Sequence, residues 1–420
     1  MSNMLDYLDW RGDLSFTDAP FNEVDNLLLA GISYVEFDDV VPGFGQGSVR
    51  LKDASDTVFR EKTDYLAGDR SFVSFAPYVL QRMAKTERFK DVRIKNYVNR
   101  INLAEELQFS SMEFVLPDGT SYVAFRGTDD TIVGWKEDFN MSYQIVPADR
   151  YAANYLNALL HIEGVGRPEK VRVGGHSKGG HLAVYASSCV PQKDRKRILS
   201  VYCNDGPGFQ SDFLETEKYR GIREKIVSIM PDAAIVGVLL NSDVDAKVIK
   251  SSGKGPMQHN PTTWQVLGNS FVKADGLAQG SKIFRESFSK WMGEISNDER
   301  KAFVDELFGI VESTGVTTLS ELQESFGTYA WMMFRNTESL SPVTKKAAEE
   351  FLRCVFYQVK ETTTANRKIG SAMPGSILSG STITGPTLPG SVQPGPKAFF
   401  AEKQNEKQSE TGDKQKSEEQ

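Results

Sequence analysis

The stretch Val171-Arg172-Val173-Gly174-Gly175-His176-Ser177-Lys178-Gly179-Gly180 decides the fold. Its apolar start predicts a strand over residues 170–173, and the residues after the serine predict a helix over 178–190. Gly175 and Gly179 flank Ser177 at two-residue spacing, and only small residues allow so tight a turn between a strand and a helix. Such a turn strains the serine backbone and presents its hydroxyl for nucleophilic attack. The alternative is a glycine-rich turn with a purely structural role.

The residues around this stretch alternate between strand and helix signals. Strands are predicted over 112–116, 120–125, 198–203 and 225–230, the first two as a hairpin. A helix is predicted over 149–162, with Asp149 as its N-cap. Strands that alternate with helices predict an α/β class fold, with a mostly parallel central sheet covered on both faces.

Composition divides the chain into three regions. Residues 1–280 are expected to form one α/β-hydrolase domain. Residues 281–368 read as a helical block that packs on or caps this domain, with helices beginning near Asn297 and at Ser341-Pro342. Residues 369–420 are rich in Gly, Ser and Pro and then in charge. This tail has too few apolar residues to offset the entropy of ordering it, so we expect it to be disordered.

The overall composition excludes several classes of protein. The 420 residues carry a net charge of −7, which argues against a nucleic-acid partner. Three distant cysteines, with no Cys-x-x-Cys pair, indicate neither a zinc site nor a disulfide framework. The acidic N-terminus and the short apolar runs predict no signal peptide and no transmembrane segment, so we expect a cytoplasmic protein. No phosphate-binding loop, dinucleotide fingerprint or metal motif occurs, and no cofactor is expected.

A serine nucleophile requires a histidine base, and the chain has only four histidines. His176 adjoins the serine, His181 lies on the following helix, and His161 ends an earlier helix. Hydrolases with this turn order their triad as serine, acid, histidine, and only His259 lies far enough downstream. We therefore expect His259 to be the base; the alternative is a surface loop histidine.

The acid of the triad should follow a strand between Ser177 and His259. Asp232 follows the strand 226–230 directly, whereas Asp205 ends the preceding strand in Asp-Gly-Pro-Gly, a sequence that also makes a good turn. Strand order favours Asp232 over Asp205.

An oxyanion hole requires two donors aimed at the developing negative charge. One is expected to be the N–H of Lys178, at the start of the helix that follows the nucleophile. The other is expected in Phe125-Arg126-Gly127-Thr128, where Gly127 permits close approach and Thr128 offers its N–H and hydroxyl.

These motifs resemble those of a known group. Phe125-Arg126-Gly127-Thr128, Gly175-His176-Ser177-Lys178-Gly179-Gly180 and Asp232 are similar to motifs of class-3 lipases, a branch of the α/β-hydrolases. Taken together with Gln258-His259-Asn260-Pro261, the Gly-His-Ser-Lys-Gly-Gly turn around Ser177 resembles more closely that of a bacterial α/β-hydrolase family of unknown function. The resemblance covers about residues 1–267 and implies a triad of Ser177, Asp232 and His259, with Thr128 in the oxyanion hole.

Lys178 departs from the lipase pattern, which usually has leucine there. Its ammonium group is expected either to bind an anionic part of the substrate or to form a salt bridge. The resemblance implies a serine hydrolase that cleaves lipid or other acyl esters, with a small-molecule substrate. Two alternatives stay open: a related thioesterase, phospholipase or transacylase, or a non-catalytic pseudo-hydrolase that acts as an interaction module.

Overall fold

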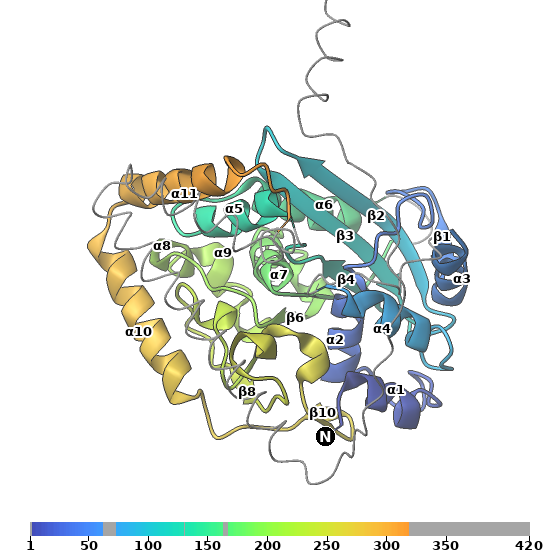
Figure 1. Ribbon diagram of the computed structural model, residues 1–420. Helices are drawn as coiled ribbons and strands as arrows, with labels where there is room; N and C mark the ends of the chain where they lie inside the picture. The colour runs from blue at the N-terminus through green and yellow to red at the C-terminus, as the bar shows by residue number, and fades with distance from the viewer. Residues whose placement is uncertain (1, 62–72, 130, 163–166, 319–420) are drawn as a thin grey trace, which may run out of the picture. The chain divides into compact units, whose positions relative to one another are not determined.

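One eight-stranded sheet organises the chain (Figure 1). The computed structural model describes residues 2–61, 73–129, 131–162 and 167–318. The strands lie in chain order across the sheet: β1 (Ser48–Arg50), β2 (Arg93–Asn102), β3 (Leu107–Val115), β4 (Ser121–Phe125), β5 (Val171–His176), β6 (Ile198–Asn204), β7 (Ile226–Pro231) and β8 (Lys247–Ile249).

The sheet is parallel where the predicted strand–helix alternation lies. Strands β4 to β8 pair in parallel, and β1 to β4 pair antiparallel. The predicted α/β fold with a mostly parallel sheet is therefore confirmed. Helices α5 (Ile132–Asn140) and α6 (Pro147–His161) connect β4 to β5, and α7 (Lys178–Ser188) follows β5.

Two hydrophobic cores cover the two faces of the sheet. Side chains alternate between them along β4, because successive strand residues point to opposite faces: Tyr122 and Ala124 join one core, Val123 and Phe125 the other. The first core packs against α1 (Met4–Arg11), α2 (Glu23–Ile32), α3 (Leu51–Glu61) and α4 (Phe75–Met83), and the second against α6 and α7. Short helices α8 (Ser211–Leu214) and α9 (Glu217–Arg220) follow β6.

Helix α2 lies inside the first core. Nine of its ten residues are buried, and they include the polar Asp25 and Asn26. Its Asn26 donates from Nδ2 to Oδ1 of Asn204 at the end of β6, 2.9 Å away, and accepts from the Tyr122 hydroxyl at 2.7 Å. Polar contacts thus tie α2 to the strand that ends beside Ser177.

The predicted N-cap of α6 is wrong. Helix α6 begins at Pro147, with Val146 as its N-cap, because proline at the first helical position needs no N–H partner. Asp149 lies in the first turn, where its carboxylate accepts the Val146 N–H at 3.2 Å. Asp149 therefore still accepts a backbone N–H at the start of the helix, but it does so from a position three residues after the N-cap.

Two helices follow the sheet and pack against different parts of the domain. In α10 (Gln279–Glu294), Phe284 packs against a small core of Met230, Ala234 and Val238. Helix α11 (Asn297–Glu312) begins with a capping box between Ser296 and Glu299 and packs on α5. The strands β9 (Val266–Leu267) and β10 (Ser270–Phe271) form a separate pair before α10.

The remaining predictions for the C-terminal part fall on residues 319–420. The helix expected at Ser341-Pro342 and the tail lie outside the described residues. In the part of the chain that the structure describes, no helix has the length and apolar character needed to cross a membrane.

Candidate active site

Ser177 lies in the turn between β5 and α7 with a strained backbone. Its φ of 57° and ψ of −135° are unusual for a residue with a side chain. The two flanking glycines are required by space: a Cβ on Gly175 would lie 2.3 Å from the carbonyl carbon of Gly179, and one on Gly179 would lie 2.1 Å from the Phe125 oxygen. The sequence spacing therefore corresponds to a real steric requirement.

His259 is held by a buried carboxylate. It ends the short 3-10 helix Gly255–His259, and its Nδ1 lies 2.6 Å from Oδ2 of Asp205. A carboxylate only accepts hydrogen bonds, so Nδ1 carries the proton and Nε2 is left as the basic nitrogen. The Asp205 side chain is fully buried, whereas that of His259 is 18% exposed. An imidazole held at Nδ1 by a carboxylate is an arrangement that can serve general base catalysis at Nε2.

The histidine and its carboxylate lie against the serine turn. The Ser177 N–H donates to the carbonyl of Asn204, the residue before Asp205, at 2.9 Å. A Cβ on Gly206, the residue after Asp205, would lie 2.7 Å from the Ser177 carbonyl oxygen. The His259 ring centroid lies 4.5 Å from that of His176, which adjoins Ser177. Ser177, His259 and Asp205 therefore come together at one edge of the sheet.

The structure corrects the choice between the two aspartates: His259 pairs with Asp205 and not with Asp232. Strand β6 is hydrogen-bonded directly to β5, so Asp205 at its end lies next to Ser177. Strand β7, which precedes Asp232, is one strand further away, a step of about 4.8 Å. Asp232 instead continues the backbone pairing, with its N–H donating to Ile249 and its carbonyl accepting from Ala278.

Asp205 has a backbone suited to its position. Its φ of 49° lies in the left-handed region, which aspartate tolerates better than most residues with side chains. Its second carboxylate oxygen, Oδ1, accepts the Gly237 N–H at 3.0 Å. Both oxygens of this buried carboxylate are therefore engaged, one by the histidine and one by the backbone.

His176 binds the loop that carries His259. Its Nε2 lies 2.8 Å from the His259 carbonyl oxygen, and its Nδ1 lies 3.0 Å from the Tyr34 hydroxyl. The carbonyl accepts from Nε2–H, so Nδ1 is the acceptor for Tyr34. Burial, with a smaller contribution from neighbouring His259, holds the pKa of His176 well below its usual range. Both ring nitrogens of His176 are engaged in hydrogen bonds, so neither is open to accept a proton from Ser177.

The two predicted oxyanion donors lie on segments that touch. A Cβ on Gly127 would lie 2.5 Å from the His176 carbonyl oxygen, so the loop after β4 packs on the serine turn. The N–H of Lys178 lies in the first turn of α7, where a helix offers no acceptor of its own. The Thr128 hydroxyl donates its proton to Oδ2 of Asp138 at 2.5 Å, so only the Thr128 N–H is left as a donor from this residue.

The Lys178 side chain does not face a substrate. Its Nζ is fully buried and lies 2.9 Å from Oε2 of Glu137 and 3.7 Å from Oδ1 of Asp138. Burial alone would lower the pKa of this ammonium, but the two carboxylates outweigh burial and the pKa is raised. Of the two expectations for Lys178, the structure contains the salt bridge, and the role in substrate binding is not compatible with this burial.

Asp138 connects Lys178 and Thr128. Burial raises the pKa of Asp138 to about 6, although the Lys178 ammonium and the Thr128 hydroxyl both act to lower it. The Arg126 guanidinium does not take part in this contact: it lies 3.5 Å from the Asp129 carboxylate and donates to Asn99. Sequence reasoning missed Glu137 and Gln108 in this region; the adjacent carboxylates Glu137 and Asp138, nine and ten residues after Thr128, were the available signal.

The other two histidines have structural contacts. His181 is buried between the carbonyl of Gly208, 2.9 Å from Nδ1, and the carboxylate of Asp149, 3.2 Å from Nε2. His161, the last residue of α6, lies with its Nε2 3.3 Å from Oδ2 of Asp194. Their positions leave His259 as the histidine beside the serine turn.

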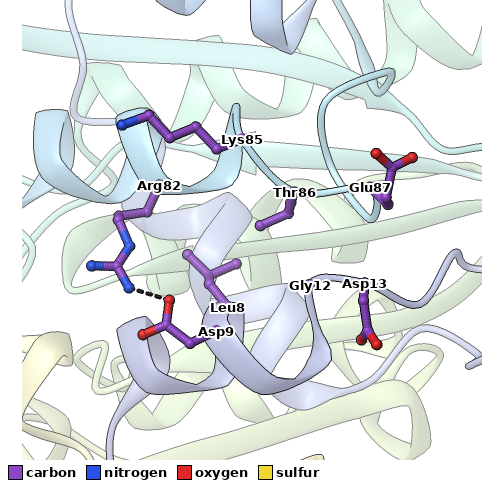
Figure 2. A pocket seen from close by; sticks show the side chains of 8 residues that line it. All are labelled: Leu8, Asp9, Gly12, Asp13, Arg82, Lys85, Thr86 and Glu87. Atoms are coloured by element: carbon purple, nitrogen blue, oxygen red, sulfur yellow. Dashed lines mark hydrogen bonds and ion pairs between the residues drawn. The ribbon is translucent and has the colours of Figure 1, made fainter.

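A shallow depression of about 380 Å³ lies elsewhere, between α1 and the end of α4 (Figure 2). Arg82 and Asp9 form an ion pair across it, and the other lining residues come from the same two segments. None of them belongs to β5, α7 or the His259 loop, so the depression is separate from the serine turn. Within the described residues, no cluster of three or more His, Cys, Asp or Glu side chains could hold a metal ion.

Comparison with known proteins places this site inside one family model. The Mbeg1-like family model matches residues 83–309, more than half of the chain. No curated protein matches the sequence. Among solved structures, the crystal structure of M37 lipase is similar at 16% identity, over 51% of this chain and 69% of that chain, with a TM-score of 0.31.

Proposed function

The chain belongs to the Mbeg1-like family, and we propose that it is a serine hydrolase that cleaves carboxylic esters of lipid or other acyl substrates. One observation carries the proposal: His259, paired with the fully buried Asp205, lies against a serine whose backbone is strained between a strand and a helix. That combination supplies a nucleophile, a base and an orienting acid. The triad is proposed as Ser177, His259 and Asp205.

The proposed reaction proceeds through an acyl-enzyme. The Ser177 Oγ attacks the ester carbonyl carbon while Nε2 of His259 takes the hydroxyl proton. The N–H groups of Lys178 and Thr128 stabilise the resulting oxyanion. The C–O bond to the alcohol then breaks, and the imidazolium gives its proton to the leaving oxygen. A water molecule, deprotonated by His259, releases the acid in the second half of the reaction.

Asp205 has an orienting role in this scheme. It accepts the Nδ1–H of His259, fixes the ring tautomer and stabilises the imidazolium that forms during each half-reaction. Because Asp205 is fully buried, its interaction with the developing positive charge is little screened by solvent. No cofactor enters any step.

A fluorophosphonate probe tests the proposal on the full chain. We expect labelling of Ser177 in the wild type and loss of labelling in Ser177→Ala. Labelling should be retained in Ser187→Ala, which changes a buried serine on α7, the helix that follows Ser177. Failure of the wild-type chain to label would favour the non-catalytic alternative. Product analysis with matched oxygen esters, thioesters and phospholipids, with and without an added alcohol acceptor, then separates ester hydrolysis from thioesterase, phospholipase and transacylase activity.

A further inference from the structure

Gln108 connects the Lys178 side chain to the loop that carries the second oxyanion donor. Gln108 lies on β3 and is fully buried. Its Oε1 accepts from Nζ of Lys178 at 2.6 Å, and its Nε2 donates to the Gly127 carbonyl at 3.3 Å and to Asp129 at 3.2 Å. One amide therefore reaches both segments that are proposed to stabilise the oxyanion.

The lysine fixes which way this amide points. The two ends of a glutamine amide are nearly isosteric, so its orientation is set by its hydrogen-bond partners. The Lys178 ammonium can only donate, and therefore the amide atom that faces it must be the oxygen. The NH2 group is left facing the carbonyl of Gly127, which can only accept.

The Gly127 carbonyl in turn fixes the direction of the Thr128 N–H. In a planar trans peptide, the C=O of one residue and the N–H of the next point in opposite directions. A hydrogen bond from Gln108 to the Gly127 oxygen thus turns the Thr128 N–H away from Gln108. On the other side of this peptide, the Thr128 hydroxyl bond to Asp138 holds the Thr128 side chain.

Glu137 keeps the ammonium in place. Its Oε2 accepts from Nζ of Lys178 at 2.9 Å and from the Gln108 N–H at 3.1 Å, while its Oε1 accepts from the Ala148 N–H at 2.9 Å. The three donors of the ammonium go to Glu137, to the Gln108 side chain and to the Gln108 carbonyl at 3.1 Å. A buried charge with all its hydrogen bonds made has one well-defined position.

We propose that Gln108, oriented by Lys178, is a positioning residue that aims the Thr128 N–H at the oxyanion of the reaction. The inference rests on the proposed function and deepens it, because it assigns a task to the lysine that departs from the lipase pattern. Lys178 then serves the oxyanion twice, directly through its backbone N–H and indirectly through its side chain.

Two substitutions of Gln108 test this role. Gln108→Met removes the amide at similar volume, and Gln108→Glu keeps an acceptor for Lys178 but replaces the donor to Gly127 by an oxygen. Ser110→Ala, two residues along β3 and also buried, is the matched control. With a short neutral ester, we expect both Gln108 variants to lower kcat by about tenfold to hundredfold with KM unchanged. Ser110→Ala should keep the wild-type kcat.

A transition-state analogue supplies a readout that a purely structural role would not change. An alkyl boronic acid forms a tetrahedral adduct with the serine and places a negative oxygen where the oxyanion develops. Its inhibition constant should rise by the same factor by which kcat falls, after normalisation to the fraction of folded enzyme. Crystal structures of wild type and Gln108→Met should show the Gly127–Thr128 peptide rotated in the variant.

The outcomes separate this inference from the proposed function. If the wild-type chain neither hydrolyses esters nor labels at Ser177, the proposed function fails and the positioning role fails with it. If the wild type is active, but both Gln108 variants keep kcat and the affinity for the boronic acid, only the positioning role is overturned. A rise in KM at constant kcat overturns it equally, because the oxyanion exists only after attack.

Discussion

His176 donates a hydrogen bond from Nε2 to the carbonyl oxygen of His259, at 2.8 Å across 83 residues of chain. The residue before the proposed nucleophile therefore holds the backbone of the proposed base. His259 is bound on two sides, by this bond at its carbonyl and by Asp205 at its ring. The loop of the base and the turn of the nucleophile thus have a fixed relative position.

Asp205→Asn should abolish most of the activity. Asparagine suits the left-handed backbone at this position, so the fold should persist. The asparagine amide does not hold the His259 ring in the tautomer that an ionised carboxylate enforces. We therefore expect kcat to fall by about 10⁴-fold. Asp232→Asn is the control, with near wild-type turnover. If Asp232→Asn loses ester hydrolysis and Asp205→Asn does not, Asp232 is the acid, as strand order had predicted.

His176 should make the protein less stable in mild acid. Burial holds its pKa well below the ordinary value of about 6.5, so below that pH the unfolded chain takes up a proton that the folded chain does not. The stability that neutral His176 contributes is present above pH 6.5. Below it, the free energy of unfolding falls by up to about 1.4 kcal/mol per pH unit.

The test compares wild type with His176→Gln by urea unfolding between pH 7.5 and 5. The variant should lack this part of the pH dependence. The difference between the two proteins is the readout, because the raised pKa of His181, beside Asp149, acts in the opposite direction in both. Parallel pH dependences would show that His176 has the same pKa in the folded and the unfolded chain, which would contradict this prediction.

Gly179→Ala should destabilise the fold strongly. The new Cβ would lie 2.1 Å from the Phe125 carbonyl oxygen, a backbone atom that cannot rotate away. We expect a loss of at least 1–3 kcal/mol in the free energy of unfolding, typical of overpacking. Gly309→Ala, in α11 with open space around it, should be neutral or gain up to about 1 kcal/mol from helix propensity. Similar stabilities for the two variants by thermal unfolding would contradict the structure.

Phe308→Ala should weaken both stability and activity. Phe308 packs edge-to-face on Phe139 of α5, the helix that carries Glu137 and Asp138. We expect a loss of about 3–5 kcal/mol in the free energy of unfolding and a lower kcat in the fraction that stays folded. Ile283→Ala, on the exposed side of α10, should change neither. Unchanged kcat in folded Phe308→Ala would mean that α11 does not support the site.

Local patterns predicted the parts of the site that depend on local geometry. Ser177 could be found because the two glycines and the strand–helix context lie within a few residues of it. His259 could be found by elimination among four histidines. The choice of acid could not be made in this way, because it depends on which strand end the His259 loop reaches, and that is set by tertiary packing.

The role of the Lys178 side chain was hidden for the same reason. Its partner Glu137 lies 41 residues earlier, on a helix whose sequence has no pattern that points to α7. A lysine next to a proposed nucleophile suggests a group that binds the substrate. Only the structure shows that its ammonium is buried in a salt bridge with Glu137. The predicted start of α6 was three residues too late. An aspartate at the N-cap and an aspartate in the first turn can both accept a free backbone N–H at the start of a helix, so the sequence alone does not distinguish them.

The burial of α2 has a consequence for synthesis of the chain. The helix is complete once residue 32 has left the ribosome, but its cover on β4 and β5 ends at residue 176, and its partner Asn204 comes later still. At about 5–20 residues per second, its apolar surface waits on the order of 10 s for those strands. During that interval, before the serine turn exists, the nascent chain exposes the apolar residues of this helix to solvent.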